Sequence, residues 1–196
     1  MCLAVLVSGS GSNMQSIVDS TKVGILRGVA KVVLVISNNP DAYALERAKN
    51  ENIKVICFKR EKYDDEESFN DVILTELQIA KVDIICLAGY TRMLGQKIIK
   101  TYPRRILNIH PSLLPKFGGK GMYGHYVHEA VVEAKETKSG ATVHFVEEEY
   151  DTGKSIIQRE IKICNADTSQ DVAQKVLSIE HQIYPEAIKK VIEEHS

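Results

Sequence analysis

The fold is decided by the stretch Leu3-Ala4-Val5-Leu6-Val7-Ser8-Gly9-Ser10-Gly11-Ser12-Asn13 near the start of the sequence. Its first five residues are apolar, which is typical of a short strand buried on both faces of a parallel sheet. A glycine-rich turn follows and leads into apolar positions with helical spacing, namely Met14, Ile17 and Val18. A strand, a tight turn and a helix start in this order indicate an α/β fold.

The same turn has the composition of an anion site. Backbone N–H groups and the positive end of the helix dipole converge at such a helix start, so Gly11, Ser12 and Asn13 are predicted to hold a phosphate. The dinucleotide fingerprint is only partly met, because Met14 occupies its third glycine position and residues 37–39 supply no acid for a ribose. We therefore interpret the turn as a phosphate monoester site, with a purely structural glycine turn as the alternative.

Strand-like and helix-like segments alternate along the rest of the chain. The predicted strands cover residues 31–36, 55–58, 84–88, 106–109, 141–146 and 155–163. The predicted helices cover residues 42–50, 63–80 and 127–134, a short one before Tyr102, and a long one from Thr168 to Val191 that is expected to bend or break at Pro185. Alternation of this kind predicts a mostly parallel sheet covered by helices.

A second informative stretch is Asn108-Ile109-His110-Pro111-Ser112-Leu113-Leu114-Pro115. Residues i and i+2 of an extended segment point to the same side, so Asn108 and His110 are expected to face one small volume at a strand end. An amide donor beside a titratable imidazole suits the polarisation of a carbonyl and the movement of a proton. The alternative is a buried, hydrogen-bonded histidine in a turn that the two prolines hold rigid.

Four further features each allow two interpretations. The cluster Tyr90 to Leu94 either lines a pocket for a flat ring or forms an ordinary strand-to-helix turn. The glycine-rich segment 116–124 is either a lid or a surface loop. Asp151 either folds back toward a neighbouring strand end or serves as an Asx-turn residue, and the sequence alone favours the turn. His125 and His128 share a helix face, but no Asp, Glu or Cys completes a metal-ligand set, so we predict no metal site.

Composition narrows the class of protein. The 196 residues, 44% of them hydrophobic, fit one globular domain with a sizeable core. A net charge of -1 and the absence of a basic stripe argue against a nucleic-acid partner. No apolar stretch approaches membrane length and no charged leader precedes the first strand, so we expect a cytoplasmic protein without a membrane partner. The cysteines lie far apart and indicate neither disulfides nor metal spacing; they are Cys2, Cys57, Cys86 and Cys164.

Five motifs, in sequence order and over essentially the whole chain, resemble those of the phosphoribosylglycinamide formyltransferases, a folate-dependent enzyme family of purine synthesis. The motifs are residues 8–13, 87–94, 108–115, 143–146 with 151–153, and 180–185. The Asn-x-His pair with a later Asp is shared with other formyl-folate enzymes, whose extra domain this length does not accommodate. The resemblance implies a Rossmann-like doubly wound, mostly parallel sheet with an antiparallel strand near the C-terminal part, in a single formyltransferase domain over residues 1–196.

The resemblance also implies a reaction. Members of the family transfer the formyl group of 10-formyltetrahydrofolate, a co-substrate, to the amine of 5′-phosphoribosylglycinamide. By this resemblance Asn108, His110 and Asp151 form the catalytic set. Asn108 and protonated His110 would stabilise the developing oxyanion, while Asp151 would favour the imidazolium and help to take the proton of the amine. The nucleophile is the amine of the substrate itself, so neither a metal nor a covalent enzyme intermediate is expected.

Binding residues follow from the same resemblance. Gly11, Ser12 and Asn13 would hold the substrate phosphate, and Glu180 would meet the glycinamide amine. The folate would be bound by a set that also includes the catalytic amide, namely Arg60, Arg92, Met93, Leu94 and Asn108. The phosphate-binding half is expected in residues 1–100 and the folate-binding and catalytic half in residues 101–196. The segment 116–124 departs from the shorter version of many members, which leaves the roles of His125 and His128 open.

Two alternative functions stay open at this point. One is a hydrolase that passes the formyl group of the folate to water, and the other is a non-catalytic folate-binding relative. The predicted phosphate turn and Glu180 argue against the first, and the complete set of Asn108, His110 and Asp151 argues against the second. Small-molecule substrates and a monomer or weak homodimer are expected.

Overall fold

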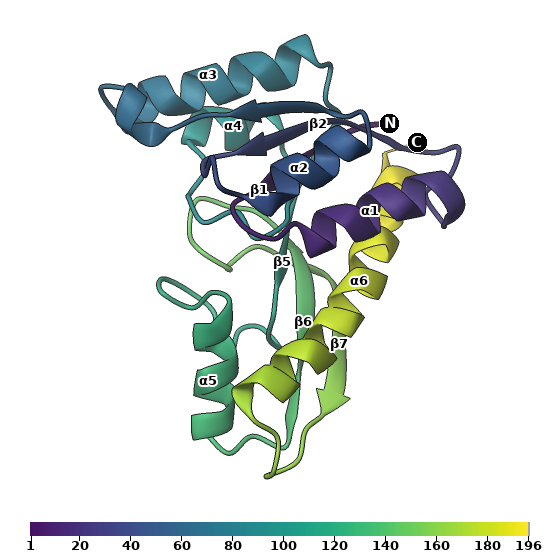
Figure 1. Cartoon of the computed structure of the whole chain (residues 1–196), viewed down its shortest axis with the longest axis vertical. Coiled ribbons are helices and arrows are strands. Elements are labelled where there is room, and N and C mark those ends of the chain that lie inside the picture. Colours follow the sequence, from purple (N-terminus) through teal and green to yellow (C-terminus); the bar gives the residue numbers. More distant parts are fainter. Residues whose placement is uncertain (196) are drawn as a thin grey trace.

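The computed structural model describes residues 1–195, which form a seven-stranded sheet with helices on both faces (Figure 1). The strands are β1 (Cys2–Val7), β2 (Lys31–Ser37), β3 (Lys54–Cys57), β4 (Ile84–Leu87), β5 (Ile106–His110), β6 (Lys138–Phe145) and β7 (Ser155–Lys162). The helices are α1 (Ser12–Val23), α2 (Tyr43–Asn50), α3 (Glu66–Ile79), α4 (Gln96–Thr101), α5 (His125–Glu133) and α6 (Ser169–Glu194), with a short 3₁₀ helix η1 (Arg60–Lys62). Every predicted strand and helix is present, with boundaries shifted by a few residues.

The strand order is β3-β2-β1-β4-β5-β6-β7. Strands β1 to β5 pair in parallel, whereas β6 is antiparallel to both β5 and β7. This topology confirms the predicted doubly wound sheet with one antiparallel strand near its C-terminal edge. The order reverses between β1 and β4, and ligands of open α/β sheets bind in the crevice at such a point.

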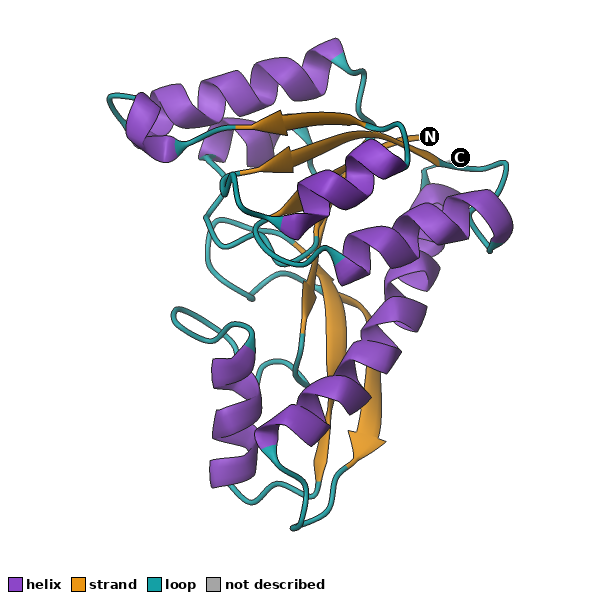
Figure 2. Ribbon diagram, in the orientation of Figure 1, coloured by secondary structure: helices purple, strands orange, loops and turns teal. Residues whose placement is uncertain are grey.

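Helices cover both faces of the sheet (Figure 2), and one hydrophobic core lies on each face. Alternate residues of β1 supply both, because successive side chains of a strand point to opposite faces. Leu3, Val5 and Val7 join the core under α1, α2, α5 and α6, whereas Ala4 and Leu6 join the core under α3 and α4. Every one of these five side chains is fully buried, which explains the unbroken apolar run in the sequence.

Helix α6 is continuous from Ser169 to Glu194, so of the two predicted outcomes, a bend or a break at Pro185, the break does not occur. A proline ring removes one backbone hydrogen bond of the helix. Tertiary packing compensates, since Ile183, Tyr184, Pro185 and Ala187 are all buried. The Tyr184 hydroxyl lies 2.8 Å from the carbonyl oxygen of Leu87 and 3.1 Å from that of Leu107, and so ties the helix to β4 and β5.

One apolar residue of α3 is exposed to solvent. Ile79 lies at the last turn of α3, and its side chain is 64% exposed although it is apolar. Helix ends project beyond the sheet that they cover, so periodicity overestimates burial there. Among residues 1–195, no helix combines the length and the apolar content needed to cross a membrane.

Candidate active site

Strand β5 places Asn108 and His110 on one side of the sheet. Leu107 and Ile109 belong to the core under α6, so the residues that alternate with them face the other way. His110 is buried, and its Nε2–H donates to the carbonyl oxygen of Phe117 at 2.8 Å. The structure therefore holds the predicted pair at the carboxyl end of β5, with the imidazole fixed by the segment that follows Pro115.

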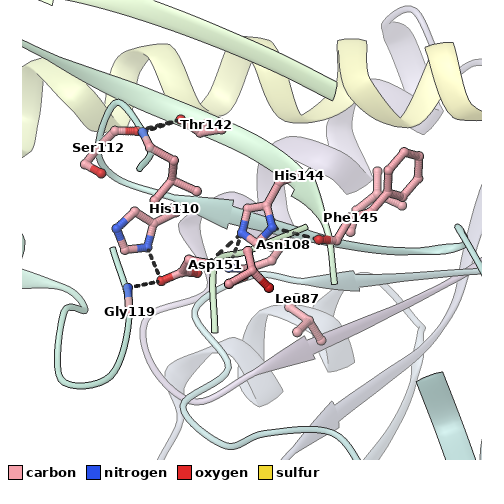
Figure 3. Close-up of polar contacts among 12 residues, drawn as sticks. Leu87, Asn108, His110, Ser112, Gly119, Thr142, His144, Phe145 and Asp151 are labelled. Atoms are coloured by element: carbon pink, nitrogen blue, oxygen red, sulfur yellow. Dashed lines mark hydrogen bonds and ion pairs between the residues drawn. The ribbon is translucent and has the colours of Figure 1, made fainter. Parts of the chain in front are cut away.

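Asp151 folds back onto this pair, which is the arrangement that the sequence alone disfavoured. Its carboxylate lies between two imidazole rings (Figure 3), 3.5 Å from Nδ1 of His110 and 3.4 Å from Nε2 of His144. The backbone N–H of Gly119 donates to the same carboxylate at 2.8 Å. Asp151 has a positive φ of 57°, a conformation that Asn and Asp tolerate better than most residues. The catalytic set expected from the resemblance is thus assembled in one place.

His144 is a member of this cluster that the sequence analysis did not single out. Its Nδ1–H donates to the carbonyl oxygen of Phe145 at 2.8 Å, which leaves Nε2 to accept from Nδ2 of Asn108 at 3.1 Å. The signal was present, because Thr142 and His144 are polar residues at alternate positions of the otherwise apolar segment 141–146. Only the β5–β6 register, in which His144 pairs with Asn108, shows that this polar face meets the catalytic set.

Burial and charge act in opposite directions on this cluster. Burial lowers the pKa of His110, and the nearby Asp151 carboxylate only partly offsets it. Burial also opposes ionisation of Asp151, but its close contacts with His144 and His110 and the hydrogen bond from the Gly119 N–H together hold the pKa of this carboxyl below its usual value. Near neutral pH the free protein therefore favours an ionised Asp151 beside a neutral His110. Desolvation of the His110 ring outweighs the effect of the neighbouring carboxylate on its pKa.

A pocket of about 460 Å³ opens beside the cluster. It is lined by Leu87, Tyr90, Arg92, Met93, Leu94, Asn108, His144, Val146, Glu147, Glu149, Tyr150 and Asp151. Half of these residues are apolar or aromatic, and the other half are polar or charged, with Asn108, His144 and Asp151 contributed by the cluster. Of the predicted folate-binding residues, the structure brings Arg92, Met93, Leu94 and Asn108 into this one pocket, so the cluster at residues 90–94 is more than a turn.

Arg60 does not line the pocket but lies close to it. It belongs to η1, and its Nε donates to Oε1 of Glu66 at 2.9 Å. Nη2 of Arg92 meets the same carboxylate oxygen at 2.7 Å. Glu66 and Arg92 also line a neighbouring cavity of about 780 Å³. The two predicted arginines are therefore linked through Glu66 beside this second cavity.

The predicted phosphate residues lie at the start of α1. Gly11 has a positive φ of 74°, and a Cβ there would lie 2.5 Å from Cβ of Ala44, so both conformation and close packing require glycine. Nδ2 of Asn13 donates to Oε2 of Glu180 at 2.8 Å. Glu180 is only 7% exposed, and burial raises the pKa of its carboxyl. The structure thus brings together Gly11, Ser12 and Asn13 from α1 and Glu180 from α6.

The segment 116–124 is part of the candidate site, because Phe117 and Gly119 bind His110 and Asp151 as described. It leads into α5, where His128 is buried and its Nδ1 has no hydrogen-bond partner among the described residues. Burial is the main reason why the pKa of His128 falls to about 4. His125 instead is exposed and stacks on Tyr126 with ring centroids 3.9 Å apart. Within residues 1–195, no group of three or more His, Cys, Asp or Glu side chains is arranged to hold a metal ion.

Comparisons with known proteins agree with this geometry. The family model described as formyl transferase matches residues 1–188. A phosphoribosylglycinamide formyltransferase of Haemophilus influenzae is 41% identical over 95% of this chain and 85% of that relative. The crystal structure of glycinamide ribonucleotide transformylase 1 from Symbiobacterium toebii superposes with a TM-score of 0.92 at 38% identity, over 98% of this chain and 88% of that one.

Plant relatives are longer than this chain. The chloroplastic phosphoribosylglycinamide formyltransferase of Arabidopsis thaliana is 40% identical over 98% of this chain, and that of Vigna unguiculata is 42% identical over the same share. The chain spans 65% and 61% of the length of these two relatives. The match therefore covers nearly all of this sequence but only part of theirs. On these similarities, the chain belongs to the formyl transferase family and, within it, to the phosphoribosylglycinamide formyltransferases.

Proposed function

We propose that the protein transfers the formyl group of 10-formyltetrahydrofolate to the amine of 5′-phosphoribosylglycinamide. The products would be N-formylglycinamide ribonucleotide and tetrahydrofolate, in de novo purine synthesis. The observation that carries the proposal is the pocket that Arg92, Met93 and Leu94 share with Asn108 and Asp151. A folate ring held by the first three residues would present its formyl group to the polar end of the pocket.

The residues at that end have the properties that formyl transfer requires. When the amine attacks the formyl carbon, a C–N bond forms and negative charge develops on the formyl oxygen. Asn108 donates one amide hydrogen to His144, which leaves its second hydrogen free for that oxygen. The proton that the amine loses would pass through the Asp151 carboxylate to Nδ1 of His110, which lies 3.5 Å away, so that a charged imidazole would stabilise the charge on the oxygen.

Asp151 would be the first acceptor of the proton that the attacking amine loses. Its low pKa keeps it ionised near neutral pH, so it can accept the proton that the amine loses, directly or through water. Collapse of the intermediate then breaks the bond between the formyl carbon and N10 of the folate, and N10 leaves with the proton that was taken from the amine, so Asp151 and His110 return to their starting forms. No residue of the protein forms a covalent bond with the formyl group in this scheme.

The pocket fits the folate-derived donor in shape and polarity. Its wall combines Leu87, Met93, Leu94 and Val146 with the aromatic ring of Tyr90, which suits a flat heterocycle. The two arginines linked through Glu66 would lie near the negatively charged benzoylglutamate part. These contacts extend the site outward from the catalytic end.

The ribonucleotide would bind at the start of α1. Backbone N–H groups at Gly11, Ser12 and Asn13 would hold its phosphate, since the first N–H groups of a helix have no partner within the helix. Glu180, hydrogen-bonded to Asn13, would meet the glycinamide amine. Thus residues 1–100 would mainly bind the phosphate and residues 101–196 would mainly carry the catalytic set, within one domain.

We also propose a cytoplasmic location and a monomer or weak homodimer. The relatives from plants are named chloroplastic, so the location needs its own test by cell fractionation. Sedimentation over a range of protein concentrations tests the oligomeric state. A concentration-independent dimer, or recovery of the protein in an organelle fraction, would contradict these two proposals.

The function is tested by following formyl transfer from 10-formyltetrahydrofolate by absorbance, with and without the ribonucleotide. We expect turnover that requires the ribonucleotide. Folate product without the ribonucleotide would indicate a hydrolase, and binding of both ligands without turnover would indicate a non-catalytic relative.

The roles of Asn108 and His110 are tested by Asn108→Ala and His110→Ala. Removing one such donor typically lowers the rate by about 10²- to 10³-fold, and we expect losses of that size in kcat with an unchanged fold. Asn50→Ala is the matched control, since Asn50 is exposed at the end of α2. A variant at position 108 or 110 that keeps full activity would contradict the assignment.

A further inference from the structure

Three strand ends meet in a ring of hydrogen bonds that the reaction scheme does not use. Ser8 follows β1, Asn38 follows β2, and Thr91 lies in the segment after β4. The Ser8 hydroxyl donates to Oδ1 of Asn38, Nδ2 of Asn38 donates to the Thr91 hydroxyl at 3.3 Å, and the Thr91 hydroxyl donates to Ser8 at 3.2 Å. Each group therefore donates to the next, and the ring closes across the point where the strand order reverses.

A fourth bond joins this ring to the main chain. The backbone N–H of Thr91 donates to the Ser8 hydroxyl at 3.0 Å. Thr91 directly precedes Arg92, Met93 and Leu94, which line the folate pocket, and it lines the neighbouring cavity itself. Ser8 is the only side chain in the described part of the chain that an assigned hydrogen bond connects to the Thr91 backbone.

We propose that Ser8 is a positioning residue for the formyl donor, acting through the backbone of Thr91. This inference rests on the proposed function. A segment that enters the pocket from an exposed residue needs an anchor at its start, and the Ser8 hydroxyl supplies it by accepting from both the N–H and the hydroxyl of Thr91. Without the anchor, residues 92–94 would have to be ordered by the ligand, and that cost would weaken binding of the folate.

The geometry separates this role from phosphate binding. The carbonyl oxygen of Ser8 accepts from Nδ2 of Asn39 at 3.0 Å, so the start of the glycine-rich turn keeps a backbone anchor when the Ser8 hydroxyl is removed. The predicted phosphate residues lie three to five positions further on. Loss of the hydroxyl should therefore affect the donor and spare the ribonucleotide.

The test is Ser8→Ala, with both Michaelis constants and kcat measured on the full chain. One hydrogen bond is typically worth about a fivefold change in affinity, so we expect KM for 10-formyltetrahydrofolate to rise about fivefold, with kcat and KM for the ribonucleotide changed less than twofold. Ser8→Thr, which keeps the hydroxyl, should restore most of the donor affinity. Ser10→Ala is the matched control, because Ser10 is exposed in the same turn.

Other results would overturn the proposal. An unchanged KM for the donor, or an equal rise in both Michaelis constants, would mean that Ser8 supports the fold in general. If the unaltered protein shows no turnover, the proposed function fails, and the same variants are compared by calorimetric binding of tetrahydrofolate. Weaker tetrahydrofolate binding in Ser8→Ala alone would still support the positioning role, while equal binding in all variants, or none, would overturn it.

Discussion

Asp151 shows how a single residue acquires its properties from groups that are distant in the sequence. Its carboxylate meets His110 from β5, His144 from β6 and the backbone of Gly119. These contacts lower its pKa although burial alone would raise it. The turn that carries Asp151 is therefore a sensitive part of the site.

Gly153 lies in that turn, where the backbone of Phe145 leaves no room for a side chain. A Cβ at this position would lie 1.8 Å from the carbonyl oxygen of Phe145, so Gly153→Ala must displace the backbone two residues after Asp151. We expect a loss of stability of about 1 to 3 kcal/mol, typical of overpacking, together with loss of formyl transfer. Urea unfolding and the transfer assay measure the two effects. Gly9→Ala is the stability control, because a Cβ there meets nothing within 4 Å.

His128 makes stability depend on pH. Its pKa is about 4 in the folded protein against an ordinary value of 6.5, so below pH 6.5 the unfolded chain binds a proton that the folded chain does not. The free energy of unfolding should fall as the pH drops from 6.5 to about 4. Below about pH 4, protonation of His128 should not lower it further. His128→Gln should reduce the slope in urea unfolding across this range, whereas the exposed His125→Gln should not. An unchanged slope for His128→Gln would contradict the prediction.

At the scale of elements, α6 shows why a proline need not end a helix. Its N-terminal half packs beside α5 and β7, and its C-terminal half packs beside α1 (Figure 1). Tyr184 in this helix is fully buried. The helix is held by these contacts and not by propensity alone. Removal of one central contact should therefore lower the stability of the whole helix.

Tyr184→Phe removes the hydroxyl that approaches the carbonyl oxygens of Leu87 and Leu107 and leaves the ring in place. The two buried carbonyl oxygens lose the one hydroxyl hydrogen that they share, and we expect a destabilisation of about 1 to 3 kcal/mol. Thermal unfolding measures it. Tyr126→Phe, at a residue that is 45% exposed, is the matched control and should be nearly neutral. Equal stability of the two variants would mean that the hydroxyl of Tyr184 contributes nothing.

At the scale of the whole molecule, the contact between α1 and α6 joins residues 167 positions apart in the sequence. It places the Glu180 carboxyl in a buried position beside Asn13, and burial raises its pKa. The ionised form is therefore disfavoured by folding. The Glu180 carboxylate, which would bind the substrate cation, therefore lowers the stability of the folded protein when it is ionised.

Glu180→Gln should reveal this cost. Because the folded pKa lies above the ordinary value of 4.5, the penalty is absent below that value and grows as the pH rises through it toward the folded pKa. We expect the variant to be more stable than the unaltered protein at pH 8, with the difference shrinking toward pH 4, and to bind the ribonucleotide poorly. Urea unfolding at both pH values measures the stability. Glu133→Gln, at an exposed residue, is the control, and a less stable Glu180→Gln at pH 8 would contradict the prediction.

Much of the fold could be predicted because its signals are local. The apolar run from Leu3 to Val7 and the amphipathic pattern of α3 each report the burial of one element, and the structure confirms both. The site was harder to predict where its residues contact others that are distant in the sequence. Asn108 and His110 were found because residues i and i+2 of one strand face the same side, which the sequence alone indicates. His144 was missed because its position beside them depends on pairing between two strands.

By itself, the sequence determined the order of strands and helices, the glycine-rich turn at the start of α1 and the polar pair on β5, since these follow from side-chain periodicity and backbone conformation within short segments. Only the tertiary structure decided that Asp151 turns toward His110, that α6 continues through Pro185, and that burial lowers the pKa of His110. Each of these outcomes is a competition between a local preference and burial against distant parts of the chain. Such competitions are settled by packing and desolvation, which do not exist until the chain has folded.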